Sequence, residues 1–169
     1  MPKYSETVIT CSFTGHRPEK LPWGDDETDP RCAALKRRIY DAAEAVYRAG
    51  IRHYICGMAQ GCDLYFAEAV IELRSEHPDI TLEAAIPCET QAKAWPERAR
   101  NRYYYVASQC DYETLLQREY TPDCMAKRNN YMVDHSSVLI AVYDGTFGGT
   151  MQTLGYAKKL GKEIIQITP

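Results

Sequence analysis

The sequence predicts a doubly wound α/β fold, with a mostly parallel sheet of about six strands and helices on both faces. Short apolar runs alternate regularly with longer stretches of helical periodicity, which is the pattern of repeated strand–helix–strand units. Several runs, such as "VLIAVY" at 138–143, are apolar almost throughout. Strands of that kind are buried on both faces, as in a parallel sheet covered by helices.

The expected elements follow one another along the whole chain. The first helix begins after Asp29-Pro30, a capping residue followed by proline, and ends at Gly50. Within it Ile39 and Val46 belong to an apolar stripe with three- and four-residue steps. No internal repeat or linker interrupts the series, so residues 1–169 are expected to form one domain. The strands are expected at 8–13, 53–56, 81–86, 112–116, 138–143 and 163–167, and the helices at 30–49, 63–76, 90–108, 122–135 and 149–160.

Composition narrows the classes of function. The net charge is −3, with acidic and basic residues interspersed, which gives no general attraction to nucleic acid or to an anionic membrane. The start "MPKYSETVITCSFTG" has no continuous apolar segment of a signal peptide, so a cytoplasmic location is expected. Seven cysteines form no CxxC pair, which favours buried free thiols over a metal site or a disulfide framework.

One connection departs from compactness. Residues 18–29, "PEKLPWGDDETD", contain two prolines and a tryptophan and show no periodicity. A surface loop of this length is either mobile or functional. The sequence leaves open whether it is a lid over a pocket or a disordered excursion.

Ligands of open α/β sheets collect at the carboxyl ends of the strands, so the residues that follow each strand are the first candidates for a site. After the first strand comes "TGHRP" at 14–18. Gly15 permits a tight turn, Thr14 offers a hydroxyl group, and His16 and Arg17 offer charge or hydrogen bonds.

A second candidate loop, "GMAQGCDLYFAE", follows the second strand. Gly57 and Gly61 would let the backbone approach a ligand closely, next to the positive end of the following helix. Asp63 stands at the start of that helix, where it either caps the helix or contacts a ribose hydroxyl. Glu68 lies farther along the helix and faces either the pocket or solvent.

A third loop, "DGTFGGT", follows the fifth strand. Gly145, Gly148 and Gly149 precede a helix that begins near Thr150. Successive exposed N–H groups of glycines form an anion-binding nest, and threonine hydroxyls add further donors. The spacing matches neither the Walker A pattern nor GxGxxG, which disfavours an ordinary ATPase or dehydrogenase.

The fourth helix carries "MAKRNNYMVDHSS". Met125, Met132 and Val133 form a buried helical stripe, so these methionines are expected in the core. Arg128 and Asn129 lie on another side, where they could reach the site, and a planar guanidinium suits phosphate. A solvated surface arginine is the alternative.

Three consecutive tyrosines occur in the third helix, at 103–105. They span most of the helix circumference, so at least one must be exposed. Packing in a homo-oligomer and stacking on a nucleobase are both compatible with such a tyrosine.

Taken together, these motifs resemble the SLOG superfamily, which contains the DNA-processing protein DprA and the lonely-guy (LOG) phosphoribohydrolases, and most of all its YpsA-like branch. The resemblance rests on the order of "TGHRP", "GMAQGCDLYFAE", "IPCETQAKAW", "RNNYM" and "DGTFGGT" over nearly the whole chain. It implies a Rossmann-like sheet of strand order 4-3-2-1-5-6 that binds a nucleotide or a nucleotide-derived small molecule across these loops.

One departure from the lonely-guy pattern bears on catalysis. Their PGGxGTxxE signature ends in a glutamate that supports cleavage of the N-glycosidic bond, and alignment with "GGTMQT" puts Thr153 in its place. Arg128 and Met132 do match the RKxxM segment of that family. The resemblance therefore implies that phosphate or ribose binding is kept while the acidic group is lost, unless Asp63, Glu68 or Asp144 substitutes for it.

The sequence thus predicts a binding module for a phosphate-containing, nucleotide-like ligand, related to NAD or ADP-ribose, that acts as a sensor or regulator. We expect no metal and no further cofactor. The protein is expected to form a homo-oligomer and to bind neither nucleic acid nor a membrane. The alternatives are a phosphoribohydrolase with a substitute carboxylate and, less favoured, a DprA-like protein that binds single-stranded DNA. The expected ligand-binding residues are Thr14, Gly15, His16, Arg17, Gly57, Gly61, Asp63, Glu68, Arg128, Asn129, Asp144, Gly145, Gly148, Gly149 and Thr150.

Overall fold

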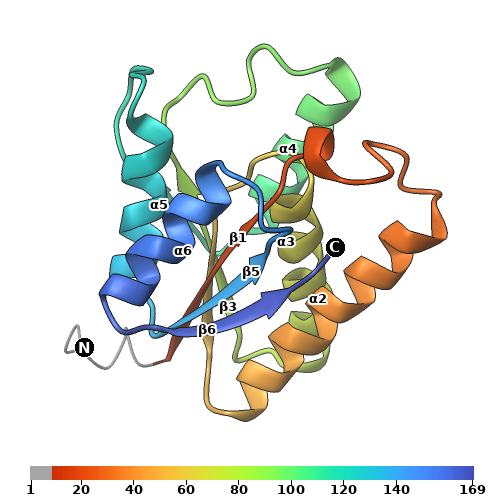
Figure 1. Cartoon of the computed structure of the whole chain (residues 1–169), viewed down its shortest axis with the longest axis vertical. Helices are drawn as coiled ribbons and strands as arrows, with labels where there is room; N and C mark the ends of the chain where they lie inside the picture. Colours follow the sequence, from red (N-terminus) through yellow and green to blue (C-terminus); the bar gives the residue numbers. More distant parts are fainter. Residues whose placement is uncertain (1–8) are drawn as a thin grey trace.

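Residues 9–169 are described by a computed structural model, which contains a six-stranded sheet with all neighbours parallel (Figure 1). The strand order is β4-β3-β2-β1-β5-β6, which confirms the predicted order. The start of the first predicted strand, at Val8, lies outside the described residues. The strands are β1 (Thr10–Gly15), β2 (His53–Cys56), β3 (Thr81–Ile86), β4 (Tyr112–Leu115), β5 (Val138–Val142) and β6 (Glu163–Ile167).

Helices cover both faces of the sheet. In Figure 1, α5 and α6 lie together on one side, and α2, α3 and α4 lie on the other. No helix within residues 9–169 is both long and apolar enough to cross a membrane. The helices are α2 (Pro30–Arg48), α3 (Cys62–Glu76), α4 (Glu97–Gln109), α5 (Cys124–Asp134) and α6 (Gly149–Lys159), and a short 3₁₀ helix, η1 (Pro18–Lys20), follows β1.

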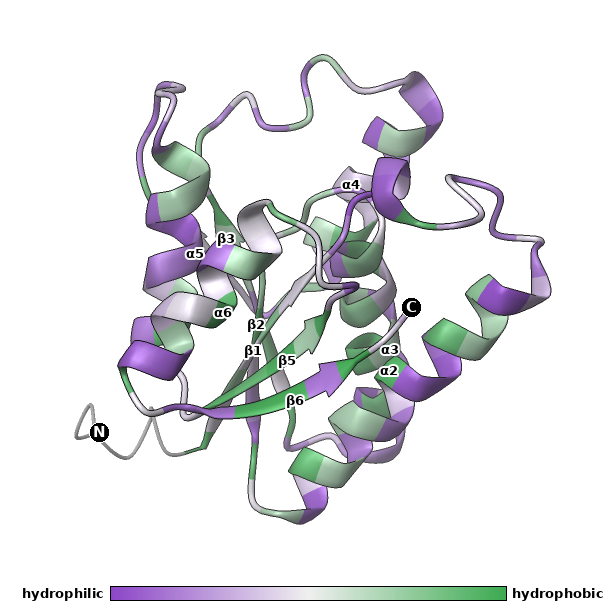
Figure 2. Ribbon diagram, viewed as in Figure 1, coloured by the Kyte–Doolittle hydropathy of each residue, from purple (hydrophilic) through white to green (hydrophobic). Residues whose placement is uncertain are grey.

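The central strands are apolar because both of their faces are buried. In β5, Ile140 packs into the large cluster under α2, α3 and α4, whereas Leu139 and Ala141 pack against α5 and α6. Side chains alternate between the two faces of a strand, so a strand with two covered faces has no polar side. Figure 2 shows β5 in the hydrophobic colour and α2 alternating between hydrophilic and hydrophobic bands along its length.

Two predicted boundaries were wrong for identifiable reasons. Strand β1 continues through Thr14 and Gly15, which pair with Ala141 and Val142 of β5, so these residues end the strand and do not follow it. Helix α4 begins at Glu97, not at residue 90, and Pro96 takes its N-cap position. Proline has no N–H to donate and restricts the residue before it, so a helix readily starts here but does not run through it.

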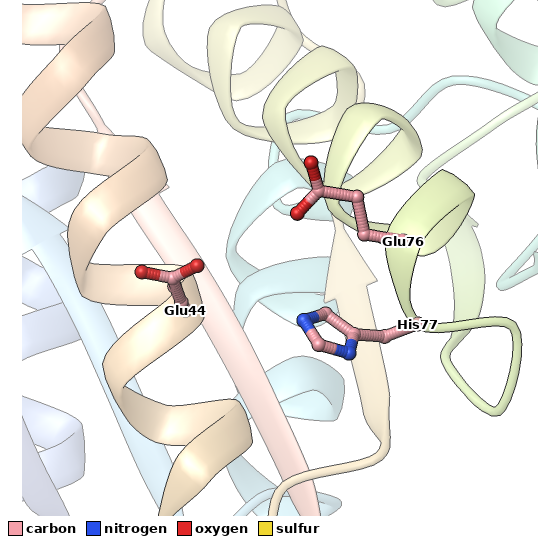
Figure 3. A group of neighbouring side chains, drawn as sticks. All are labelled: Glu44, Glu76 and His77. Atoms are coloured by element: carbon pink, nitrogen blue, oxygen red, sulfur yellow. The ribbon is translucent and has the colours of Figure 1, made fainter.

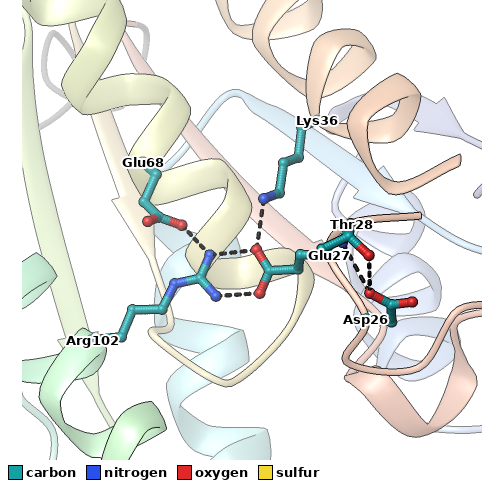
Figure 4. Close-up of polar contacts among 6 residues, drawn as sticks. All are labelled: Asp26, Glu27, Thr28, Lys36, Glu68 and Arg102. Carbon is teal, nitrogen blue, oxygen red and sulfur yellow. Dashed lines mark hydrogen bonds and ion pairs between the residues drawn. The ribbon is translucent and has the colours of Figure 1, made fainter. Parts of the chain in front are cut away.

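The segment 18–29 is neither unstructured nor detached from the fold. Its Leu21 and Trp23 are buried in the large hydrophobic cluster. Glu27 accepts hydrogen bonds from Arg102 of α4 and from Lys36 of α2, and Arg102 also pairs with Glu68 of α3 (Figure 4). An ion cluster therefore ties this segment to three helices.

Replacement of Glu27 by Gln should destabilise the protein by about 1–2 kcal/mol at pH 7, because it leaves two cations without their shared carboxylate. Burial raises the pKa of Glu27, but the hydrogen bonds from Arg102 and Lys36 outweigh it and hold the pKa below its usual 4.5. Since the folded-state pKa is depressed, the wild type's advantage should be complete above pH 4.5 and shrink as the pH falls below it.

Urea unfolding of both proteins at pH 7, 4 and 3 measures this difference. Glu89→Gln is the matched control, because it removes the partner of Arg118 from a more exposed pair, and it should change the free energy of unfolding by less than about 0.5 kcal/mol. A Glu27→Gln effect that stays constant down to pH 3 would contradict the assignment.

Candidate functional site

A cavity of about 350 Å³ opens at the carboxyl ends of β1 and β5. The chain leaves β1 through α2 toward β2 on one side, whereas β5 lies on the other side of β1. The crevice between these two strand ends is therefore the point where strand order reverses, which is the usual ligand position in open α/β sheets. Cavities of this volume accommodate small molecules.

The end of β1 supplies one wall of the cavity. Thr14 is nearly buried and lines the cavity. Arg17 also lines the cavity but is exposed to solvent. No hydrogen bond or ion pair holds the Arg17 guanidinium among residues 9–169, so its donors are available to a ligand. Gly15 also lines the wall, but a Cβ atom there would lie 2.6 Å from the Cβ of Cys62, so its small size serves the packing of α3 on β1.

The buried His16 connects β1 to the loop that follows β5. Its Nε2 lies 2.8 Å from Asp144 Oδ1 and 3.0 Å from the Asp144 backbone nitrogen. Burial lowers the pKa of His16 against the opposing effect of the Asp144 carboxylate, so the ring is neutral at pH 7 and Nε2 serves one contact at a time, as donor to the carboxylate or as acceptor from the N–H. Two hydrogen bonds from Thr146 hold the pKa of Asp144 at about 2, so this carboxylate stays ionised.

The glycine loop presents the positive end of α6 to the cavity. Gly148, Gly149 and Thr150 line the wall, and Thr150 is nearly buried. The N–H of Gln152 donates to the Gly148 carbonyl at 3.1 Å and begins the helical hydrogen bonds of α6. The N–H groups ahead of it have no partner in the described part of the chain, and such groups at a helix start favour an anion.

Lys20 of η1 lines the cavity and contacts the loop that follows β5. Its Nζ donates to the Phe147 carbonyl at 2.5 Å and to Thr146 Oγ1 at 3.1 Å. Lys20 and its neighbour Glu19 both line the cavity, so the segment after β1 and the loop after β5 form one rim.

Arg128 of α5 is 3% exposed and also lines the cavity, which rules out the alternative of a solvated surface arginine. Its guanidinium donates to the Gly57 carbonyl and, at 2.8 Å, to the side-chain oxygen of Asn129, and it contacts the sulfur of Met125 at 3.7 Å. A guanidinium has five N–H groups, so two remain for a ligand. Burial lowers the pKa of Arg128 from its usual value, with the charge of Asp63 acting in the opposite direction.

Asp63 places a carboxylate in the same cavity, near Arg128. It stands in the first turn of α3, but the N-cap residue is Gly61, so capping does not explain it. One oxygen accepts the N–H of Ala59 at 3.1 Å. Burial raises the pKa of Asp63, whereas the charge of Arg128 and the Ala59 hydrogen bond lower it, and the net shift is upward.

Two glycines of the second loop have a packing role that the sequence analysis did not predict. A Cβ atom on Gly57 would lie 2.7 Å from the Arg128 guanidinium. Gly61 has φ = +84°, and a Cβ atom there would lie 2.9 Å from the His16 carbonyl oxygen. Their close approach is therefore to other parts of the protein, not to the space of the cavity.

Ten of the fifteen predicted residues line one cavity, and five do not. Glu68 is directed into the ion cluster with Arg102, Asp144 engages His16 and Thr146, and Gly145 lies outside the wall. The structure adds seven residues that sequence reasoning missed or assigned to the core alone, although all but the first belonged to segments already singled out: Phe13, Glu19, Lys20, Ala59, Met125, Met132 and Phe147.

Thr153, which aligns with the lonely-guy glutamate, cannot reach a ligand in this cavity. It is 3% exposed, and its hydroxyl donates to the Gly149 carbonyl at 2.8 Å inside α6. The position contributes neither a carboxylate nor a free hydroxyl to the site.

A second cavity, of about 620 Å³, lies near the amino ends of the strands. At its floor Glu83 accepts hydrogen bonds from His53 (2.8 Å), Thr114 (2.9 Å) and Tyr131 (2.6 Å). Burial raises the pKa of Glu83, but these hydrogen bonds outweigh it and lower the pKa overall. The network joins β2, β3 and β4 to α5, and it satisfies a nearly buried carboxylate.

Glu44, Glu76 and His77 form a further group near the carboxyl ends of α2 and α3 (Figure 3), and none of them lines the first cavity. Their potential ligand atoms lie within 4.8 Å of one another. Glu44 also pairs with Arg48, and the His77 ring stacks on Tyr47. Glu44 and His77 thus have ordinary contacts between side chains on the surfaces of the helices.

All seven cysteines are unpaired, and six are buried. Burial raises the pKa of the Cys11 and Cys62 thiols well above their usual value, which leaves them protonated and unreactive. The prediction of free thiols is confirmed.

The sequence and the fold are similar to those of known proteins. The model of the YspA SLOG family matches residues 11–165. UPF0398 proteins of Bacillus thuringiensis (strain Al Hakam) and Bacillus cereus (strain AH187) are each 29% identical over 156 residues, which cover 90% of this chain and 84% of theirs.

Two solved structures share the fold. DNA processing protein A (DprA) from Streptococcus pneumoniae superposes with a TM-score of 0.63 at 13% identity, covering 94% of this chain and 50% of that one. DprA from Helicobacter pylori, described with a single-stranded DNA binding mode, gives 0.62 at 16% identity, covering 98% and 68%. The chain thus spans half of the first structure, and at these identities the likeness concerns the fold alone.

The different roles of the glycines can be measured. Gly61→Ala should lower the free energy of unfolding by about 2 kcal/mol, because it combines a left-handed backbone with a clash against the His16 carbonyl. Gly149→Ala is the matched variant in the other loop, where an added Cβ meets nothing within 4 Å, and should stay within about 0.5 kcal/mol of wild type. Equal losses in urea unfolding would show that the two loops do not differ in this way.

Proposed function

The chain belongs to the YspA SLOG family, and from this premise and the cavity at the strand ends we propose that it binds a phosphate-containing nucleotide or nucleotide-derived small molecule. The ligand is of the NAD or ADP-ribose kind, and the protein acts as a sensor or regulatory module. The observation that carries the proposal is the convergence of the α6 N-terminus, Arg17 and Arg128 on one cavity.

The charges in the cavity suit a phosphate ester better than a neutral ligand. Among the described residues, the N–H groups at the start of α6 have no partner and already point out of the helix end toward an anion. The exposed guanidinium of Arg17 adds donors that can close on the same anion. Arg128 adds a buried cation to the wall of the same cavity. Asp63 provides a carboxylate oxygen, which is the kind of acceptor that sugar hydroxyls require.

A binding role is favoured over catalysis because position 153 supplies no carboxylate to the cavity. A role in nucleic-acid binding, suggested by the DprA folds, is less favoured because the net charge of the chain is −3. Its test is direct: affinity for single-stranded DNA that exceeds the affinity for mononucleotides and falls steeply with added salt would replace the present proposal.

Replacement of Gly149 by Val should abolish nucleotide binding while the protein stays folded, because the side chain would enter the cavity without meeting protein atoms within 4 Å of its Cβ. Arg17→Ala should weaken binding by about tenfold through loss of a charge-assisted hydrogen bond. Gly155→Val is the matched control, since it lies in the same helix, is exposed and is remote from the cavity wall.

Native mass spectrometry of the purified protein, followed by calorimetry with AMP, ADP, NAD and ADP-ribose, measures these effects. Binding that Gly149→Val leaves unchanged, or that Gly155→Val impairs equally, would remove the cavity as the site.

A second candidate function, phosphoribohydrolase activity, is favoured by one observation. Of the three candidate carboxylates only Asp63 lines the cavity, and its burial raises its pKa, as in a general acid. Glu68 and Asp144 are committed to partners elsewhere.

If the protein cleaves a nucleoside monophosphate, Asp63→Asn should reduce release of the free base at least 100-fold, because the amide cannot transfer the proton. Asn still offers an oxygen to the Ala59 N–H, so the fold should persist. Glu68→Gln removes a carboxylate from the same helix outside the cavity and should leave the rate unchanged. If chromatography shows that the nucleotide is still intact after prolonged incubation with the wild type, this function is excluded.

A further inference from the structure

Phe147 is an exposed aromatic side chain at the edge of the proposed nucleotide site. It lines the cavity next to Gly148 and Gly149, yet 75% of its surface remains in contact with solvent. This is the largest exposed fraction among the large hydrophobic residues of the described chain. What distinguishes Phe147 from other exposed apolar residues is that it lines the cavity, so its free ring face is available to a ligand bound there.

The backbone around Phe147 is held firmly. Its carbonyl accepts a hydrogen bond from Lys20 Nζ, and the preceding residue, Thr146, is fixed by two hydrogen bonds to Asp144 Oδ1. Its exposure therefore does not result from a loop without contacts. The backbone that carries the ring is therefore fixed before a ligand binds, which is the advantage of a preorganised site.

We propose that Phe147 is the stacking platform for the nucleobase of the bound ligand and makes the site selective for nucleotides over base-free sugar phosphates. This inference rests on the proposed function. Every nucleobase has a π-face, and stacking on an aromatic side chain is favourable irrespective of base identity. Phe147 would thus detect that a base is present, but it would not distinguish one base from another by its hydrogen-bond donors and acceptors.

The position of Phe147 along the loop agrees with the length of a nucleotide. Consecutive Cα atoms are about 3.8 Å apart, so Phe147 stands within about 8 Å of Gly149, where the α6 N–H groups would hold the phosphate. The side chain of Met125, which contacts Arg128, adds a polarisable apolar surface to the same cavity wall. Arg17 and Asp63 belong to the polar part of the wall. The loop therefore holds an aromatic ring and anion-binding N–H groups within the length of one nucleotide.

The experiment compares AMP with ribose 5-phosphate, which has the same sugar and phosphate but no base. Phe147→Ala should weaken AMP binding by about tenfold in calorimetry and leave ribose 5-phosphate affinity within twofold of wild type. Phe147→Tyr, which keeps a ring, should retain AMP affinity. Phe147→Trp adds a direct signal, because AMP should quench the additional tryptophan emission and ribose 5-phosphate should not.

The outcomes separate this inference from the proposed function. Equal weakening of both ligands by Phe147→Ala, or no weakening of AMP, would overturn the stacking role while leaving nucleotide binding intact. Absence of binding of AMP, ADP, NAD, ADP-ribose and ribose 5-phosphate to the wild type would overturn both. Leu160→Ala, which truncates an exposed apolar side chain beyond the end of α6, controls for unspecific loss of surface.

Discussion

The parallel pairing of β1 with β5 is the constraint on which the rest of the structure depends. Gly15 pairs with Val142 at the ends of the two strands, so the chain leaves both of them at the same edge of the sheet. Because β1 continues toward β2 on one side and β5 toward β6 on the other, no connection crosses the space between them. The residues that follow these strands then face each other across a crevice, and His16 and Lys20 bridge it to Asp144 and Phe147.

Much of the fold could be predicted because its signals are local. Strand β5 is apolar on both faces, and the Asp29-Pro30 cap of α2 sets its start, with Asp29 accepting the N–H of Arg31. The start of α4 and the end of β1 could not be predicted as well. The first depends on Pro96 overriding an otherwise helical composition, and the second on pairing with a strand more than 120 residues away.

The glycines show why the site was harder to predict than the fold. The sequence predicts that a ligand approaches the backbone closely at Gly57 and Gly61, but which group approaches them is set by the tertiary structure. At Gly57 it is the Arg128 guanidinium, and at Gly61 the His16 carbonyl. Only Gly148 and Gly149 combine a place on the cavity wall with a helix start. The position of Glu68 also depends on a tertiary partner. It lies five residues after Asp63 on α3, but it pairs with Arg102 and does not line the cavity.

The two arginines of the cavity illustrate how the protein divides positioning from recognition. Arg128 is buried and fixed by Gly57, Asn129 and Met125, so the cost of desolvating and orienting its guanidinium is met by folding. A ligand gains its charge without ordering it, which is the general advantage of a preorganised site. Arg17 is exposed and unpaired among the described residues, so its ordering has to accompany ligand binding. Under the proposed function, a fixed buried cation and an adjustable exposed one on the same cavity wall would let the site select an anion by position and then enclose it.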